Sequence, residues 1–555
     1  MKIALAQLNY HIGNFESNTN KILDCIQKAK SQNADLVVFS ELAICGYPPR
    51  DFLEFDHFIL KCIDCINTIA ASCVNIAAIV GSPSFNPELK GKRLYNSAFF
   101  LKDGKVNEIR HKTLLPTYDV FDEYRYFEPN RNFETIEYKG VNIALNICED
   151  LWNISDDPLY VTNPMDELLK QKPDIIINIA ASPFHYKQSE IRKEILTANS
   201  KHYHIPLLYV NHVGAQTELL FDGGSMAIDN KGNIVEELNY FEEDLKIYEL
   251  RFTNDDLGKY NIIPINTKSK IVNRKSKIEL IHDALMMGIK NYFQKLGFKQ
   301  AVLGLSGGID SAVTCVLATE ALGKENVKGV LLPSRFSSDH SIKDAEELAK
   351  NLGIPYEIIE IEEAFHAFEE TLKPSFAGKP FDLAEENIQA RVRAVILMAL
   401  SNKFGYILLN TSNKSEAAVG YGTLYGDMCG GISVLGDVYK TQVYELANYI
   451  NKEKEIIPNN SIVKPPSAEL RPNQKDQDSL PEYKLLDKIL FQYIEMNAGP
   501  DDIVAMGFDE AIVHKVLKMV NTSEWKRYQT PPILRISPKA FGMGRRMPIA
   551  AKYLA

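Results

Sequence analysis

Three residues that could carry out acyl-transfer chemistry stand at the ends of strand-like runs in the first half of the chain. Glu41 follows "DLVVFS", Lys112 follows "VNEIRH" and Cys148 follows "VNIALNI". A carboxylate can act as a general base, an ammonium group can stabilise an oxyanion, and a thiol can act as a nucleophile. Taken singly, each has an ordinary explanation: a surface acid, a solvated lysine and a buried core thiol. They form a candidate centre if the three strands end at one edge of a sheet.

Two more acids lie beside the thiol. Glu149 and Asp150 follow Cys148 directly and at first resemble catalytic acids. With Glu41 as the base, we expect them instead to support the nucleophile. Cys45 lies close to Glu41 in the sequence but has no base and cation of its own, so we expect it to be structural.

A glycine loop in the second half predicts a phosphate site. Ser306-Gly307-Gly308-Ile309-Asp310-Ser311 lies between the strand-like "AVLGL" and a helical run. Glycines let backbone N–H groups approach an anion closely, and a helix N-terminus adds favourable partial charge. No lysine follows the glycines, so this is not the GxxxxGK[ST] loop of kinases and GTPases.

Buried strands alternating with helices must position the first three residues. The strand-like runs are 3–8, 35–41, 75–82, 97–109, 141–147, 174–182 and 206–213, and the helical runs are 17–32 and 189–203. Asp103-Gly104 and Asn230-Lys231-Gly232 are expected to be hairpin turns. This pattern predicts an α/β layered domain over residues 1–250.

The second half repeats the alternation in a different order. Residues 251–275 read as a linker whose Lys/Arg cluster is a solvated surface. A second domain is then expected over 276–555, with helices at 277–297, 310–323, 341–353 and 383–405 and strands at 301–306, 327–334, 356–361 and 406–412. This βαβαβ order predicts a doubly wound parallel sheet that binds ligands at the carboxyl ends of its strands.

Composition excludes several classes of protein. The chain has 555 residues, 45% hydrophobic and 24% charged, and a formal net charge of −10, which argues against nucleic-acid binding. No apolar run is long enough to cross a membrane, and the start lacks the apolar stretch of a signal peptide. Eight scattered cysteines and the absence of an export signal predict a reducing cytoplasm. The Cys62–Cys65 pair has no partner pair, so we expect plain packing.

The glycine loop resembles the pyrophosphate loop of the N-type ATP pyrophosphatases, which cleave ATP to AMP and pyrophosphate. With "ENIQARVR", "NTSNKSEAAVGYGTLYGDMCGG", "LGDVYKTQV", "KPPSAELRPNQKDQDSLPEY" and "RISPKAFG", the second half resembles the synthetase domain of the NAD⁺ synthetases. The resemblance implies an ATP site at Gly304, Leu305, Ser306, Gly307, Gly308, Ile309, Asp310, Ser311, Thr411, Lys440 and Ser467. It also implies a deamido-NAD site at Asn387, Arg391, Glu416 and Lys539, with Mg²⁺ held by Asp310 and Glu416.

That chemistry needs ammonia. Attack by the nicotinate carboxylate on the α-phosphate of ATP gives an acyl adenylate, which ammonia then converts to the amide; Lys and Mg²⁺ would stabilise the departing pyrophosphate. Ammonia is mostly ammonium at neutral pH and then has no lone pair to attack with. A domain that releases ammonia beside the synthetase would supply it.

The first half resembles such a domain. "FSEL", "HKTLLP" and "NICEDLW" are similar to the motifs of the nitrilase-like amidases, in the form found in glutamine-dependent NAD⁺ synthetases. The resemblance implies an α-β-β-α sandwich, a homo-oligomer, a supporting Glu123 and glutamine contacts at Tyr118, Ser182 and Gln188. One departure is "HYKQ" in place of the usual "HxGK" after Ser182, which moves the basic residue to Lys187 and leaves Gln188 assigned by position only.

The leading hypothesis is therefore an enzyme that converts deamido-NAD, ATP and L-glutamine into NAD⁺, AMP, pyrophosphate and glutamate. One alternative is an ammonia-dependent synthetase whose front domain is only a scaffold, against which the intact Glu41, Lys112 and Cys148 speak. Another is a different ATP-pyrophosphatase amidotransferase, which would usually have a glutaminase of another fold. A nucleotide-sensing module without catalysis would need neither the three residues nor the carboxylates for Mg²⁺.

Overall fold

The computed structural model describes residues 1–88, 90–154, 157–255, 258–265 and 275–554. The chain divides into two compact units, Met1–Arg274 and Lys275–Ala555. Most of the expected Lys/Arg cluster lies outside the described residues. Within the described residues, no helix has both the length and the apolar composition that a membrane crossing requires.

Unit 1 contains a first sheet of seven strands. Their spatial order is β15 (Gly258–Pro264), β14 (Asp244–Asp255), β1 (Lys2–Gln7), β2 (Leu36–Val38), β3 (Ala77–Phe85), β4 (Leu94–Lys102) and β5 (Lys105–His111). β1, β2 and β3 are parallel and the other pairs antiparallel. The β4–β5 hairpin turns at Asp103 and Gly104, both with positive φ, as the Asp-Gly sequence predicts.

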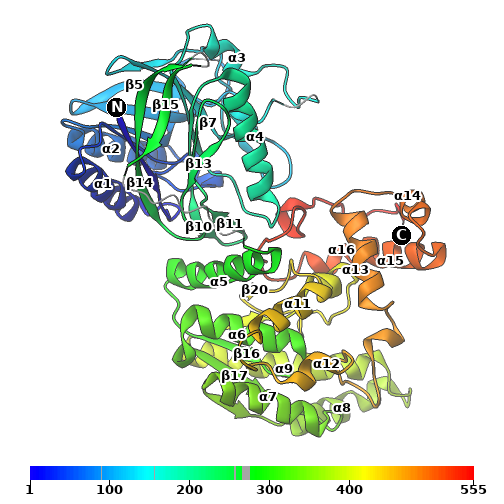
Figure 1. The fold of residues 1–555 in the computed structure, drawn as a ribbon. Helices are drawn as coiled ribbons and strands as arrows, with labels where there is room; N and C mark the ends of the chain where they lie inside the picture. Colours follow the sequence, from blue (N-terminus) through cyan, green and yellow to red (C-terminus); the bar gives the residue numbers. More distant parts are fainter. Residues whose placement is uncertain (89, 155–156, 256–257, 266–274, 555) are drawn as a thin grey trace. The chain divides into compact units, whose positions relative to one another are not determined.

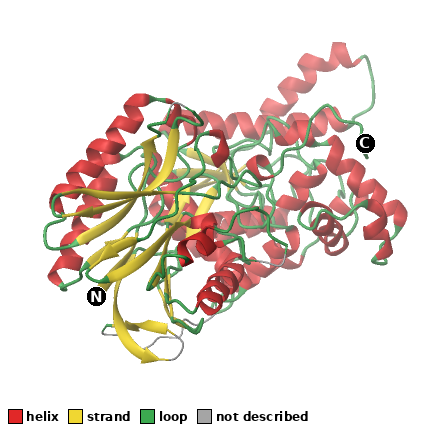
Figure 2. Ribbon diagram, turned by 90° about the horizontal axis from the view of Figure 1, so that it is seen from above, coloured by secondary structure: helices red, strands yellow, loops and turns green. Residues whose placement is uncertain are grey.

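A second sheet of six strands faces the first. Its order is β13 (Ile234–Glu237), β12 (Met226–Ile228), β9 (Leu207–Asn211), β8 (Ile175–Ala180), β7 (Val141–Ile147) and β6 (Ile136–Tyr138), and a separate hairpin pairs β10 (Val213–Gln216) with β11 (Leu219–Asp222). Helices α1 (Phe15–Ser31) and α2 (Asp56–Ser72) contact the first sheet, and α3 (Pro164–Leu169) and α4 (Gln188–Tyr203) contact the second (Figure 1). Figure 2 shows the strands of unit 1 in yellow with red helices outside them.

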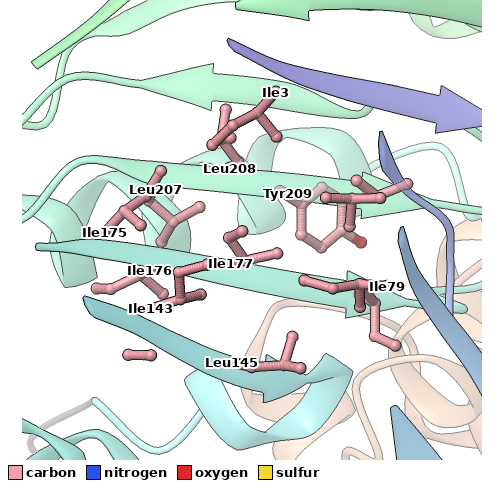
Figure 3. Packing of buried hydrophobic residues seen from close by; sticks show 14 of the residues in the cluster. Ile3, Ile79, Ile143, Leu145, Ile175, Ile176, Ile177, Leu207, Leu208 and Tyr209 are labelled. Carbon is pink, nitrogen blue, oxygen red and sulfur yellow. The ribbon is translucent and has the colours of Figure 1, made fainter. Parts of the chain in front are cut away.

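The apolar faces of the two sheets form one core. Ile3 and Ile79 from the first sheet pack with Ile143, Ile177 and Leu208 from the second, all fully or almost fully buried (Figure 3). Parallel strands buried on both faces explain the continuous apolar runs of the sequence. The α-β-β-α sandwich that the resemblance implied is confirmed.

Residues 251–255 and 258–264 differ from their expected place in a linker. The first group completes β14 and the second forms β15, and residues 244–249 of β14 pair antiparallel with the whole of β1. The first unit therefore continues beyond residue 250. The polar run "TNDDLGK" interrupts the apolar alternation of the sequence, and this hid the two strands.

Unit 2 is built on a five-stranded sheet in which every pair is parallel. Its order is β18 (Tyr356–Ile358), β17 (Val327–Leu331), β16 (Ala301–Gly304), β19 (Ile407–Asn410) and β20 (Ile432–Ser433). The chain crosses from β16 toward β18 and then returns to β19 on the other side of β16. The doubly wound sheet is confirmed, and its strand order reverses between β16 and β19, where such sheets bind ligands.

Helices cover this sheet and extend beyond it. They are α5 (Lys277–Leu296), α6 (Ile309–Leu322), α7 (Asp339–Leu352), α8 (Glu362–Phe376), α9 (Leu383–Phe404), α10 (Lys414–Val419), α11 (Lys440–Ile450) and α12 (Asn459–Val463). The C-terminal helices α13 (Tyr483–Ile494), α14 (Pro500–Ala505) and α15 (Glu510–Thr522) share a core with α10, and α16 (Glu524–Arg527) contacts α15 (Figure 1).

Candidate active sites

The three candidate residues of unit 1 meet at the ends of their strands. Glu41 follows β2, Lys112 follows β5 and Cys148 follows β7, and their exposed fractions are 0%, 1% and 5%. Lys112 Nζ lies 2.7 Å from Glu41 Oε1. The Cys148 thiol interacts electrostatically with both. A base, a cation and a thiol are thus adjacent in a buried site.

A second carboxylate completes this cluster. Lys112 Nζ lies 2.8 Å from Glu123 Oε1, and the Tyr47 hydroxyl donates to the same oxygen at 2.9 Å. Burial, together with Glu41, raises the pKa of Glu123 to about 7, although Lys112 opposes the rise. Burial lowers the pKa of Lys112, but Glu123 and Glu41 outweigh it and raise that pKa well above the ordinary value, so the lysine stays a cation.

The thiol needs a base before it can react. Burial, followed by Glu41, raises the pKa of Cys148 well above its ordinary value, although Lys112 acts in the opposite direction. The group is therefore a thiol at neutral pH. Because the thiolate is the nucleophile, transfer of this proton to a neighbouring carboxylate must accompany attack.

A tight turn presents Cys148 to the cluster. Cys148 has a φ of +47°, a left-handed conformation that costs a non-glycine residue about 1–3 kcal/mol. Asp150 fixes the turn: one of its oxygens accepts from Ile147 N at 3.0 Å, and the other accepts from Thr113 N at 3.0 Å and Leu114 N at 2.8 Å. Asp150 thereby ties the nucleophile turn to the segment after Lys112, which is the support role expected of it.

Glu149 points to a different group of side chains. Its carboxylate accepts from the hydroxyls of Tyr118 at 2.8 Å and Tyr160 at 3.1 Å, and burial raises its pKa. Tyr118, expected to contact glutamine, is therefore held by the residue next to the nucleophile. Tyr160 lies outside every motif of the sequence and was not predicted.

Ser182 and Gln188, the other expected glutamine contacts, lie together. Gln188 begins α4 and its Nε2 donates to Ser182 Oγ at 3.2 Å. Ser182 follows β8, and its backbone N–H donates to Asn211 Oδ1 at 2.9 Å. The buried Tyr209 hydroxyl interacts with both Ser182 and Cys148, which relates this pair to the nucleophile.

The glycine loop of unit 2 leads from β16 into α6 and borders a cavity of about 620 Å³. Gly307 has a φ of +74°, and a Cβ there would lie 2.2 Å from Ser341 O, so only glycine fits. Gly308 caps α6 without a side-chain bond, which leaves N–H groups of the first turn for an anion. Among the other expected ATP residues, Gly304, Leu305, Ser306, Ile309, Asp310, Ser311, Thr411, Lys440 and Ser467 line the cavity.

Two carboxylates and a lysine converge in this cavity. Lys440 Nζ is paired with Asp310 and lies 3.7 Å from Glu416 Oε1, and Asn413 Nδ2 donates to Asp310 Oδ1 at 2.9 Å. Burial and then Asp310 raise the pKa of Glu416 to about 8, against the effect of Lys440. Two hard carboxyl groups next to a phosphate cradle fit Mg²⁺, which binds through one or two carboxylates and substrate oxygens.

Asp476 is a further acid of this cavity, which Asp427 and Glu469 also line, and no sequence motif assigned it. Its carboxylate accepts from the hydroxyls of Tyr421 at 3.0 Å and Tyr483 at 2.8 Å, and its charge also raises the pKa of Glu416. Its place in the polar segment "NQKDQDS" gave no hint of burial, yet only 4% of it is exposed.

The remaining deamido-NAD candidates lie elsewhere on unit 2. Asn387 Oδ1 accepts from Thr423 Oγ1 at 2.6 Å, and Arg391, one turn further along α9, donates through Nε to Leu424 O at 3.2 Å. Both side chains therefore face the 423–424 loop, whereas neither is among the described residues that line the cavity. Lys539 accepts through its backbone oxygen from Lys414 Nζ at 2.8 Å.

Comparison with known families relates both units to nitrogen-transfer enzymes. A model described as Carbon-nitrogen hydrolase matches residues 2–255, and one described as NAD synthase matches residues 281–530. The chain is 44% identical over 558 residues to the glutamine-dependent NAD(+) synthetase of Synechocystis sp., covering 99% of each chain. It is 41% identical over 579 residues to that of Thermotoga maritima, covering 100% of this chain and 99% of the relative.

Solved structures agree with these matches. The glutamine-dependent NAD⁺ synthetase of Acinetobacter baumannii in complex with ADP is 39% identical, with a TM-score of 0.78 over 99% of this chain and 98% of the other. The structure from Cytophaga hutchinsonii is 21% identical, with a TM-score of 0.82 over 99% and 98%, and supports the fold alone.

Proposed function

The chain belongs to the glutamine-dependent NAD(+) synthetase family, and from this premise we propose which of its residues perform each part of the reaction. The enzyme is a carbon–nitrogen ligase that amidates deamido-NAD to NAD⁺ at the expense of ATP, with L-glutamine as the nitrogen donor. We assign glutamine hydrolysis to residues 1–250 together with strands β14 and β15. We assign amidation to residues 276–555.

Glutamine hydrolysis proceeds through a thioester on Cys148. Glu41 takes the thiol proton as the sulfur attacks the side-chain amide carbon, and Lys112 stabilises the oxyanion that forms. Collapse of this intermediate breaks the C–N bond, and the proton held by Glu41 passes to the leaving ammonia. Glu41 then takes a proton from water, which attacks the thioester and releases glutamate with return of the thiol.

Glutamine binding follows from the groups around the nucleophile. Glu149, whose carboxylate Tyr118 and Tyr160 hold, is suited to accept from the substrate's ammonium group. Ser182 and Gln188, at the start of α4, offer neutral donors to its carboxylate. In this assignment Gln188 occupies the position at which the family usually has its basic residue. The basic residue of this chain is Lys187, one place earlier.

Amidation takes place at the cavity of unit 2. The loop Gly304–Ser311 binds the ATP phosphates, with Thr411 and Ser467 as further nucleotide contacts. Asp310 and Glu416 would hold Mg²⁺, which neutralises charge on the phosphates when bound. Lys440, next to both acids, stabilises the charge of the departing pyrophosphate.

The acceptor site involves α9. Asn387 and Arg391 bind deamido-NAD together with the 423–424 loop that they contact, and Lys539 and Glu416 are its further contacts. A homo-oligomer in the cytoplasm, as the resemblance implies, is part of the same proposal. Sedimentation and cell fractionation test these two points.

The observation that carries the assignment is Lys112 between Glu41 and Glu123, next to Cys148. Cys148→Ala removes the nucleophile and leaves unit 2 unchanged. We expect synthesis from glutamine to fall by more than about 1,000-fold and synthesis from ammonium chloride to stay within about twofold. Retention of glutamine-driven synthesis would refute the role of Cys148.

A further inference from the structure

One buried amide, Asn96, contacts both carboxylates of the cluster and the backbone of its lysine. It lies on β4 and is 1% exposed. Its Nδ2 donates to Glu41 Oε1 at 2.7 Å and reaches Glu123 Oε2 at 3.4 Å. Its backbone oxygen accepts from Lys112 N at 2.8 Å. A single residue thus fixes both acids and the backbone that carries the lysine.

The other half of the same amide makes no comparable contact. Asn96 Oδ1 is buried and has no hydrogen-bond partner among the described residues. A buried acceptor without a partner is costly, and such exceptions in folded proteins call for an explanation. The contacts of Nδ2 explain why Oδ1 has no partner. If the amide were turned over, Oδ1 would point at the two carboxylates and the N–H donors would be lost to them.

The two carboxylates of the cluster need a hydrogen-bond donor that carries no charge. Glu41 and Glu123 share one cation, Lys112, and the titratable side chains that interact with them are Cys148, Tyr47, Glu149 and Tyr160. His212 Nε2 also lies 2.6 Å from the backbone oxygen of Glu41. A hydrogen bond to the charged form favours ionisation of a carboxyl group. An amide supplies that bond without adding a charge that would compete for Lys112.

We propose that Asn96 is a positioning residue of the glutaminase centre, which holds Glu41 and Glu123 around Lys112 and fixes the Glu41 carboxylate where it receives the Cys148 proton. This inference rests on the proposed roles of Glu41 and Cys148. Asn96 itself touches neither the thiol nor a substrate in any described contact, so its effect is exerted through Glu41.

The test is Asn96→Leu in the full chain, which keeps the branched shape and removes both donors. Because the donor is lost, we expect the acidic limb of the glutamine-driven kcat/KM profile to move up by about one pH unit. At pH 7 we expect kcat to fall about tenfold or more, with KM within about twofold. The alkylation rate of Cys148 by iodoacetamide, followed by mass spectrometry, should show the same shift.

Ser97→Ala is the matched control. Ser97 is the next residue of β4, is fully buried, and bonds Ser84 and His111 instead of the carboxylates. We expect its loss to affect stability and not the pH profile. Asn96→Ala, which leaves room for water, is the second variant if the leucine variant does not fold, and ammonium-driven synthesis reports whether unit 2 is intact.

A pH profile equal to that of the native enzyme, or an equal loss of kcat/KM at every pH, would show a merely structural role for Asn96. That outcome leaves the proposed function in place. Failure of the proposed function would instead appear as glutamine-driven synthesis by Cys148→Ala. The two results are independent.

Discussion

The Lys440 ammonium group is paired with the Asp310 carboxylate, and this pair joins the first turn of α11 to the first turn of α6. Burial lowers the pKa of Lys440, but Asp310 and Glu416 outweigh it and raise that pKa, so the lysine remains charged in a nearly closed environment. One cation therefore balances two acids beside the phosphate cradle.

Lys440→Met should disable synthesis from either nitrogen source. The change leaves Asp310 and Glu416 without their cation and removes a positive group from the pyrophosphate, so we expect kcat to fall about 100-fold or more. Alkylation of Cys148 should be unchanged. Lys452→Met, which removes an exposed lysine just beyond the end of α11, is the control. Normal ammonium-driven synthesis by the Lys440 variant would rule out its role.

Binding of Mg²⁺ with ATP should depend on pH through Glu416. Its pKa of about 8 means that it carries a proton at pH 7, and a metal ligand must lose it. Apparent affinity should therefore rise about tenfold per pH unit up to about pH 8, with release of about one proton per metal ion at pH 7. Calorimetry in two buffers measures this release. Glu416→Gln should abolish it, and no release by the native enzyme would contradict the assignment.

Gly307→Ala should abolish ATP use. The new Cβ would lie 2.2 Å from Ser341 O at a φ of +74°, so the loop must move away from α7. We expect both forms of synthesis to fall about 100-fold or more. Gly297→Ala is the control that separates backbone strain from steric collision. Gly297 has a φ of +78°, but a Cβ added there would meet nothing within 4 Å. That control should lose only about 1 kcal/mol of stability, measured as a lower Tm.

His282 should stabilise unit 2 below alkaline pH. Its ring nitrogens lie 3.2 Å from Asp283 and 3.1 Å from Glu320, and although burial lowers its pKa these bonds raise it from 6.5 to about 9. The raised pKa means that the folded state binds the proton more tightly. The stabilisation is complete below about pH 6.5 and disappears as the pH rises through about 9.

His282→Gln should remove this contribution. Because the site is partly solvated, we expect a loss of about 1–2 kcal/mol at pH 6.5 and little loss at about pH 10, measured from Tm. His514→Gln, on an exposed face of α15, is the matched change and should have no such dependence. Equal destabilisation by His282→Gln at both pH values would contradict the ion-pair explanation.

The sequence could predict the elements because the buried strands are continuous apolar runs, and Glu41 and Cys148 stood out because each follows such a strand closely. Lys112 follows β5, which is not buried, so the motif "HKTLLP" was the signal that identified it. Asn96 and Tyr47 could not be found in the same way. Asn96 lies inside β4, where a polar residue in an apolar strand looks like an ordinary outward-facing position. Its burial depends on β3 and β5 and on Glu41, which are distant in the sequence.

The roles of adjacent acids were equally hidden. Glu149 and Asp150 are neighbours, yet one faces the tyrosines and the other the backbone, because the turn at Cys148 sends successive side chains in different directions. Asp476 was missed because a polar segment does not reveal which of its acids two tyrosines enclose. In each case the missing information is a three-dimensional contact.

The left-handed, buried setting of Cys148 has a consequence for oxidative damage. Peroxide oxidises the thiolate far faster than the thiol. Burial and Glu41 both raise the pKa of Cys148, so in the resting enzyme this residue is a thiol, which peroxide oxidises slowly. The same surroundings that oblige Glu41 to take a proton during catalysis therefore protect the sulfur between turnovers.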